Sequence, residues 1–153
     1  MRAFNQTTED EIERRRQILS EMFAQVGPRV EVEPPFYCDY GENIHVGDGL
    51  FMNFDCVILD CARVDIGRNA FIGPGVHIYA AYHPTDPTTR NSGMELAAPV
   101  KIGDDCWIGG HVTICPGVTI GDGTTLGTGS VVVKDVPARI LAAGNPCRVI
   151  RKL

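Results

Sequence analysis

The sequence predicts an all-β fold: a parallel β-helix of hexapeptide repeats, with a short N-terminal α-helix and an excursion loop. Three regularities support this prediction. An aliphatic residue recurs every six positions between Ile102 and Val132, a small residue follows it four positions later, and glycine often comes directly after it. A β-sandwich would instead show period-two alternation, with turns at intervals of roughly 8 to 12 residues.

The six-residue period has a mechanical cause. An inward aliphatic side chain, a small residue near a corner and a permissive glycine build one short flat face, and three such faces make one triangular coil. Stacked coils pair as parallel strands about 4.8 Å apart, so each coil satisfies the backbone of its neighbours. Earlier copies of the repeat start at Ile66, Ile72 and Ile78, and a fainter copy starts at Ile44 and Leu50.

The first element is expected to be one amphipathic helix over residues 8–26. Thr8 and Glu11 have the spacing of a capping box, and apolar residues follow at helical intervals. Gly27 and Pro28 end the helix. We therefore predict an N-terminal helical segment over residues 1–28 and a β-helix domain over residues 29–153.

The hexapeptide repeat is interrupted between Ile78 and Pro99 by a segment rich in proline, asparagine and glycine. Such a segment cannot lie in a flat wall, so we expect an excursion loop over residues 79–99. Long ordered loops in compact domains commonly carry function.

The bulk properties limit the possible partners. With 153 residues the chain has room for one domain, and its net charge of -5 argues against binding nucleic acid or an anionic membrane surface. No apolar stretch approaches the roughly twenty residues that span a bilayer, which indicates a soluble cytoplasmic protein. The six cysteines form no CxxC pair, and most are expected to be buried thiols.

Several short strings carry a more specific resemblance. They are HPTDP at 83–87, RNSG at 90–93, PVKIG at 99–103, CWIGG at 106–110, PGVTIG at 116–121, VKDVP at 133–137 and GNPCRVI at 144–150, with NFD at 53–55 upstream. With these strings nearly the whole chain resembles the sugar O-acetyltransferases of the hexapeptide-repeat family, which include maltose, galactoside and nodulation-factor acetyltransferases. The resemblance implies a left-handed coil, a homotrimer, acetyl-CoA as the acetyl donor and a small-molecule acceptor.

Acetyl transfer to an alcohol needs a base near the hydroxyl, and histidine suits that role near neutral pH. The resemblance implies that His83, in the excursion loop, is the base. It also implies that the backbone N–H of Gly110 donates a hydrogen bond to the oxyanion. The other histidines, His45, His77 and His111, lie within the repeat, where a structural or interface role is expected.

The resemblance also assigns the donor and acceptor contacts. Trp107 would lie beside the thioester, and Thr128 would lie along the pantetheine arm. Lys134, Arg148 and Arg151 would meet the phosphates of the nucleotide end, although a solvated basic tail remains an alternative.

Asp39, Asn53, Asp60 and Glu95 would face the acceptor, because carboxylates and amides suit sugar hydroxyls. The maltose and galactoside enzymes carry an additional segment before the helix that is not seen in this sequence. We therefore expect weaker acceptor selectivity than in those enzymes.

Two other functions remain open, and the histidine spacing argues against a third. A xenobiotic acetyltransferase shares the coil and a loop histidine, and a catalytically silent scaffold shares the repeat. The γ-type carbonic anhydrases build the same coil around zinc, but two of their histidines are five positions apart, a spacing found nowhere here. No metal is therefore expected.

Overall fold

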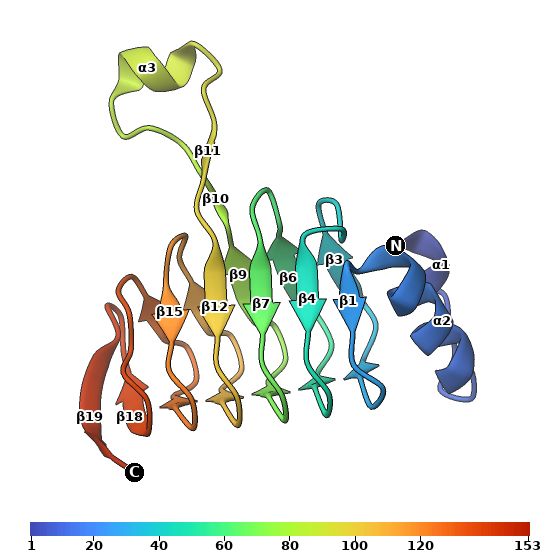
Figure 1. The fold of residues 1–153 in the computed structure, drawn as a ribbon. Coiled ribbons are helices and arrows are strands. Elements are labelled where there is room, and N and C mark those ends of the chain that lie inside the picture. The colour runs from blue at the N-terminus through green and yellow to red at the C-terminus, as the bar shows by residue number, and fades with distance from the viewer.

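Three parallel sheets form the walls of a triangular coil in the computed structural model, which describes residues 1–153 (Figure 1). The first wall contains β1 (Gln25–Val26), β4 (Ile44–Val46), β7 (Val64–Ile66), β12 (Val100–Ile102) and β15 (Thr119–Ile120). The second contains β2 (Glu31–Val32), β5 (Phe51–Met52), β8 (Phe71–Ile72), β13 (Trp107–Ile108), β16 (Thr125–Leu126) and β18 (Ile140–Ala143), with β19 (Arg148–Lys152) added antiparallel at its edge. The third contains β3 (Phe36–Cys38), β6 (Cys56–Leu59), β9 (His77–Tyr79), β14 (Thr113–Ile114) and β17 (Val131–Val132).

The corners are named by the walls that they join. The first corner leads from the first wall to the second, the second corner from the second wall to the third, and the third corner from the third wall back to the first. Strands of successive coils pair in register, as Ile66 does with Ile102 and Ile102 with Ile120. The predicted parallel β-helix is thereby confirmed.

The aliphatic positions of the repeat fill the inside of the coil. Ile102, Ile108, Ile114, Ile120, Leu126 and Val132 are each at most 1% exposed. Burial of one such side chain is worth roughly 1.5–3 kcal/mol. The repeat thus predicted both the register of the walls and the composition of the core.

Glycine at the first corner allows successive coils to approach closely. A Cβ placed on Gly67 would lie 2.6 Å from the carbonyl carbon of Gly103, in the next coil. No side chain fits there, so the glycine of the repeat is required by space.

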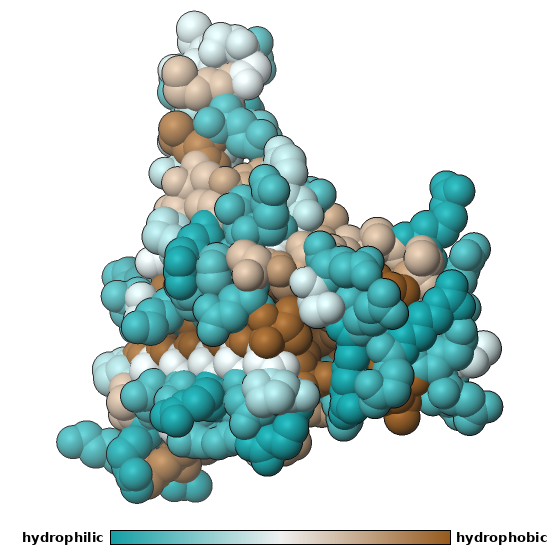
Figure 2. Space-filling model, turned by 45° about the vertical axis from the view of Figure 1, so that its right-hand side comes forward, coloured by the Kyte–Doolittle hydropathy of each residue, from teal (hydrophilic) through white to brown (hydrophobic).

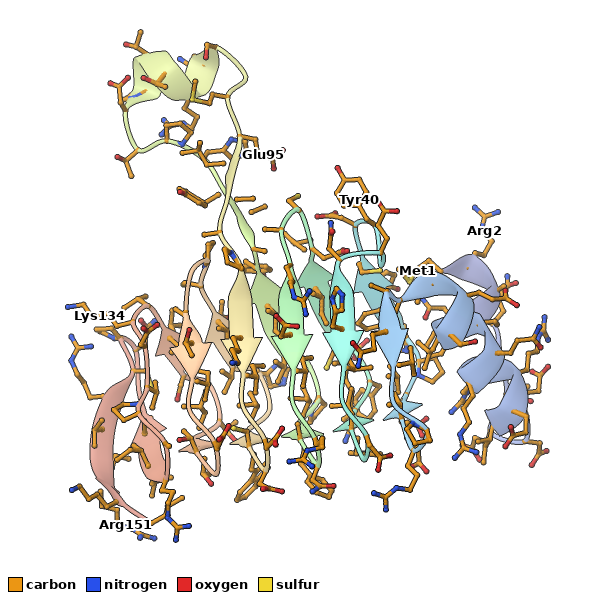
Figure 3. The ribbon with its side chains drawn as sticks, in the orientation of Figure 1. Met1, Arg2, Tyr40, Glu95, Lys134 and Arg151 are labelled. Carbon is orange, nitrogen blue, oxygen red and sulfur yellow. The ribbon has the colours of Figure 1, made fainter.

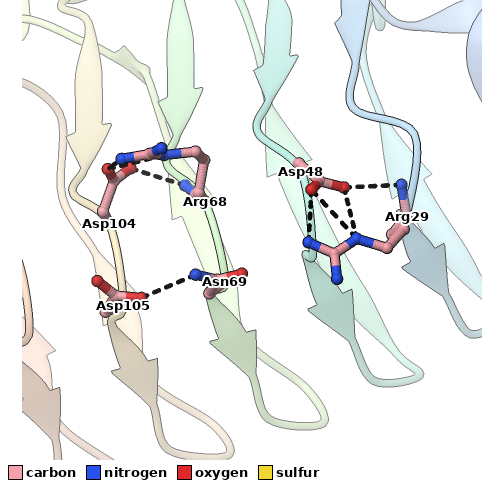
Figure 4. A network of polar contacts seen from close by, with 6 residues as sticks. All are labelled: Arg29, Asp48, Arg68, Asn69, Asp104 and Asp105. Carbon is pink, nitrogen blue, oxygen red and sulfur yellow. Dashed lines mark hydrogen bonds and ion pairs between the residues drawn. The ribbon is translucent and has the colours of Figure 1, made fainter.

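Polar side chains link the coils along the first corner (Figure 4). Asp48 accepts hydrogen bonds from the backbone and guanidinium of Arg29, and Asp104 accepts equivalent bonds from Arg68. Beside the second pair, the Asn69 amide donates to Asp105 at 3.0 Å. Hydrogen bonding to arginine holds the pKa of both Asp48 and Asp104 below the usual carboxyl range.

Two short helices, α1 (Arg2–Asn5) and α2 (Ile12–Met22), cover the N-terminal end of the coil (Figure 1). Phe36 of the coil contacts Phe4 and Phe23 edge-on, with ring centroids 6.4 and 5.6 Å apart. The half-buried contact between Arg15 and Glu33, at 2.9 Å, joins α2 to the coil. The outer surface of this end is largely hydrophilic (Figure 2).

The helix is shorter than the expected range of 8–26. It begins at Ile12, because the backbone of Glu11, with φ of -96° and ψ of 38°, is not helical. Residues 8–11 form a separate turn, in which the Glu11 carboxylate accepts the N–H of Thr8 at 2.8 Å. At the other end, Gln25 and Val26 pair with β4 as the first strand of the coil. Strand pairing therefore begins within the segment that was expected to be helical.

The chain leaves the coil after Tyr79 and returns at Val100. In between, β10 (Ala81–Tyr82) and β11 (Leu96–Ala97) form an antiparallel ribbon that projects beyond the coil and carries α3 (Pro87–Asn91) at its tip (Figure 1). The Asp86 carboxylate caps α3 by accepting the N–H of Thr89 at 2.7 Å. After the loop, β12 pairs with β7, so the coil continues in register.

Two further expectations concern cysteines and membranes. All six cysteines are free, but only Cys56 and Cys106 are buried and the other four are partly exposed, so the expectation that most are buried was wrong. None of the three helices has the length and apolar character needed to cross a bilayer.

Candidate acetyl-transfer site

His83 lies on the excursion loop, immediately after β10, and its side chain is exposed. Its Nδ1 is 3.0 Å from the carbonyl oxygen of Met94, on the returning arm of the loop. A carbonyl oxygen only accepts, so in the neutral imidazole Nδ1 carries the hydrogen and Nε2 has the free lone pair. The arrangement therefore presents Nε2 to solvent as a proton acceptor.

A groove lies at the third corner, beside the base of this loop. It is lined by Tyr40, Glu42, Asn43, Cys61, Glu95, Leu96 and Ala97. Tyr40 and Glu95 stand on the same side of the coil in Figure 3. Of the residues expected to face an acceptor, Glu95 lines this groove, and Asp39 is exposed beside it.

Cys61 is a groove residue that the sequence analysis missed. Its thiol donates to Oδ2 of Asp39 at 3.4 Å. Burial, followed by the hydrogen bond to Asp39, raises the pKa of the Cys61 thiol above its ordinary value. Its position directly after Asp60, at the same corner, was the only signal in the sequence.

Asp60 was expected to face the acceptor, but its exposed fraction is 0%. Its carboxylate accepts the N–H groups of Asp39, Tyr40, Gly41 and Asn43 at 3.1, 2.9, 2.8 and 3.3 Å. A side chain with no accessible surface and with both oxygens engaged cannot contact an acceptor in this conformation. Asp60 therefore binds the backbone of residues 39–43 of its own chain.

A second group of expected residues lies at the second corner. Asn53 follows β5, Gly110 follows β13 and Thr128 follows β16. Gly110 and Thr128 are on adjacent levels of the coil, whereas the level of β8 lies between Asn53 and Gly110. The N–H of Gly110 donates to no group of its own chain, whereas its carbonyl accepts the N–H of Gly129 at 2.9 Å. Trp107 lies on the adjoining second wall with 59% of its surface exposed.

Basic residues gather at the C-terminal end. Lys134 is exposed at the third corner, where Figure 3 shows it on the same edge as Tyr40 and Glu95. Arg148 and Arg151 are exposed on β19, opposite Ala143 and Leu141. None of the three forms an ion pair with an acidic side chain. This end can therefore attract a polyanion, even though the chain as a whole is acidic.

One chain does not bring these groups into a single site. His83 and Glu95 are at the third corner, whereas Gly110 and Thr128 are at the second, and the whole width of the third wall separates the two corners. The side chains form no cluster of three or more histidines, cysteines or acidic residues that could hold a metal ion.

Comparisons with known proteins agree with the fold. Residues 99–134 match the family described as bacterial transferase hexapeptide (six repeats). The structure of a maltose O-acetyltransferase from Clostridium difficile 630 is 55% identical, with a TM-score of 0.98 over 99% of this chain and 81% of that one. Galactoside O-acetyltransferase from Escherichia coli K12 is 46% identical over 100% of this chain and 75% of its own length.

A hexapeptide-repeat acetyltransferase from Vibrio cholerae O1 biovar eltor, whose structure is in complex with acetyl coenzyme A, is 39% identical. Its TM-score is 0.94, over 98% of this chain and 81% of that one. The matched fold is the left-handed parallel β-helix.

Proposed function

This chain belongs to the hexapeptide-repeat acetyltransferase family, and from that premise we propose that it transfers the acetyl group of acetyl-CoA to a hydroxyl of a sugar. The observation that carries this proposal is the contact between His83 Nδ1 and the Met94 carbonyl, which leaves Nε2 free to accept a proton. Similarity to maltose and galactoside O-acetyltransferases supports a sugar as the acceptor.

In the proposed reaction, Nε2 of His83 removes the proton of the acceptor hydroxyl as its oxygen attacks the thioester carbonyl. The carbonyl oxygen becomes an oxyanion, which the unengaged N–H of Gly110 stabilises. Such a donor is commonly worth about 3 kcal/mol in the transition state. When the intermediate collapses, the C–S bond breaks, the imidazolium returns its proton to the leaving CoA thiolate, and the acetyl ester remains.

The proposed site lies between two subunits of a homotrimer. His83 and Gly110 are at different corners of one coil, so a neighbouring subunit has to bring its second corner to the loop of the first. The outer face of the third wall carries the partly buried Val57, His77, Thr113 and Val131 and the exposed Tyr37, a surface suited to burial between subunits.

For the donor, Trp107 offers an exposed aromatic surface beside Gly110, and Thr128 extends the same corner toward Arg148. Lys134, Arg148 and Arg151 would meet the phosphates of CoA, because guanidinium and ammonium groups form charge-assisted hydrogen bonds with phosphate oxygens. For the acceptor, Asp39, Asn53 and Glu95 supply carboxylate and amide groups that match the donors and acceptors of sugar hydroxyls.

An acceptor screen tests the proposed function. Purified protein is incubated with acetyl-CoA and glucose, maltose, isopropyl β-thiogalactoside or chloramphenicol, and CoA release is followed with a thiol reagent. We expect release that depends on a sugar, with the acetyl ester identified by mass spectrometry. Release with chloramphenicol but with no sugar would favour a xenobiotic acceptor instead, and no release with any hydroxyl compound would overturn the proposal.

A further inference from the structure

We propose that Asp60 is a positioning residue that holds one wall of the acceptor groove in place. This inference rests on the proposed function, because it concerns the groove in which the acceptor is expected to bind. Asp60 would set the position of Asp39 and Tyr40 through their backbone, without contacting the acceptor itself.

The first argument is the number of bonds that converge on one carboxylate. Four of the five backbone N–H groups between residues 39 and 43 donate to Asp60, at 2.8 to 3.3 Å. A carboxylate offers about four lone pairs, so these bonds use its full capacity. A fifth bond has the same direction, since the Asn43 side-chain amide donates to the Asp60 backbone carbonyl at 2.8 Å.

The second argument is burial. A carboxylate removed from water is costly unless hydrogen bonds replace its hydration. The exposed fraction of Asp60 is 0%, so the segment over residues 39–43 has to stay wrapped around it. Gly41 makes that path possible, because its φ of 82° lies in the left-handed region, where a side chain would be strained.

The third argument is what this segment displays. Tyr40, Glu42 and Asn43 line the groove opposite Glu95, Leu96 and Ala97 of the excursion loop. The backbone N–H of Asp39 donates to Asp60, and the Asp39 carboxylate accepts a hydrogen bond from the Cys61 thiol at the same corner. The wrapped segment is therefore one side of the groove, and its shape depends on a residue that no acceptor can reach.

Kinetics of Asp60→Asn test this role. Asparagine has a single carbonyl oxygen and would turn an NH₂ group toward N–H donors. Residues 39–43 would then be held less firmly against the coil. We expect the Michaelis constant for the sugar that proves active in the acceptor screen to rise about tenfold or more, with the constant for acetyl-CoA within about twofold of wild type. Amide hydrogen exchange over residues 39–43 should accelerate, while exchange in the walls stays unchanged.

Thr124→Val is the matched control. Thr124 is also 0% exposed, and it also ties the coil by hydrogen bonds, to the Pro137 carbonyl and the Ile140 N–H, but it is remote from the groove. Loss of its bonds should lower the melting temperature without raising the acceptor constant. If Asp60→Asn fails to fold, Asn43→Ala replaces it, with faster hydrogen exchange over residues 39–42 as the deciding readout, because Asn43 itself lines the groove.

A double-substitution cycle with Asp39→Ala separates positioning from a general structural effect. If Asp60 acts through Asp39, the two changes together should raise the acceptor constant by less than the product of their separate effects. An unchanged acceptor constant, an equal rise in the acetyl-CoA constant, or multiplicative effects would overturn the inference. If the wild-type protein acetylates no acceptor, the proposed function fails, and hydrogen exchange alone decides whether Asp60 holds the wall.

Discussion

Arg68 and Asp104 are 36 positions apart in the sequence, yet the guanidinium Nη2 of one lies 2.7 Å from Oδ2 of the other. They stand on successive coils, because the excursion loop between them adds length to the chain and no height to the coil (Figures 1 and 4). The Arg68 backbone N–H donates to the same carboxylate at 2.8 Å. This pair closes the first corner of the two coils between which the loop is inserted.

The first prediction concerns the acid stability of this pair. The Asp104 pKa is lowered in the folded state, so its contribution is present above the ordinary carboxyl range and is lost as pH falls through the folded pKa. Asp104→Asn should lower the melting temperature at pH 7 by about 2 °C, because exposed ion pairs contribute little. The difference from wild type should shrink at pH 3, while the exposed Asp10→Asn serves as control. An equal difference at both pH values would contradict the assignment.

The second prediction concerns His83. His83→Ala should lower turnover by about a hundredfold or more, because the reaction loses its base, while the Michaelis constant for acetyl-CoA changes little. The measurement is steady-state CoA release at saturating acceptor. His45→Ala, which removes a histidine from the first wall, should keep near-wild-type turnover. Equal losses of turnover in both variants would show that His83 is not the base.

The third prediction concerns assembly. Light scattering should give three times the chain mass of 16.6 kDa. When His83→Ala chains are refolded together with Arg148→Ala/Arg151→Ala chains, activity at low acetyl-CoA should recover, since some sites then combine an intact histidine with intact arginines. A mixture no more active than its components, or a stable active monomer, would show that each site belongs to one chain.

The fourth prediction concerns the C-terminal strand. Arg148→Ala and Arg151→Ala should each raise the Michaelis constant for acetyl-CoA about tenfold, with no change in that for the acceptor. The wild-type constant should rise with salt, because added ions screen the attraction. Arg2→Ala, at the opposite end of the molecule in Figure 3, is the control and should bind acetyl-CoA normally. If all three variants behave alike, β19 is a solvated basic tail.

The fifth prediction concerns the Cys61 thiol. Asp39→Asn removes the carboxylate that helps to raise the pKa of this thiol, so more thiolate is present at a given pH. Alkylation of Cys61 by iodoacetamide at pH 8 should therefore accelerate about threefold, as measured by peptide mapping. Cys115, whose pKa is raised by burial alone, provides the internal reference. An unchanged ratio of the two rates would show that the contact with Asp39 has no influence.

The coil could be predicted because its cause is local and repeated. Each hexapeptide sets the next wall, so Ile102 and Ile120 had to face inward at the same register. The ends of the first helix depend on contacts across the fold. Gln25 and Val26 have side chains compatible with a helical turn, but the free edge of β4 pairs with them as a strand.

The candidate site was predictable in part. His83 could be selected as a candidate because it lies where the repeat is interrupted and a recognisable string begins. Asp60 and Cys61 are neighbours at one corner, and only the fold shows that the first is turned inward to the backbone while the second lines the groove. The sequence marks the corner but not the direction of the side chains.

The ribbon of β10 and β11 leaves the coil and rejoins it at adjacent points, since the Ala98 N–H donates to the Ala80 carbonyl at 2.8 Å. Everything beyond that contact is, in architectural terms, an exchangeable cassette. The coil requires only that the two ends of this segment stay side by side. The segment between them can therefore vary in length and composition without changing how the coils pack. The segment that carries the proposed base, His83, is thus an insertion into the stack, whereas the proposed oxyanion donor, Gly110, belongs to the stack itself.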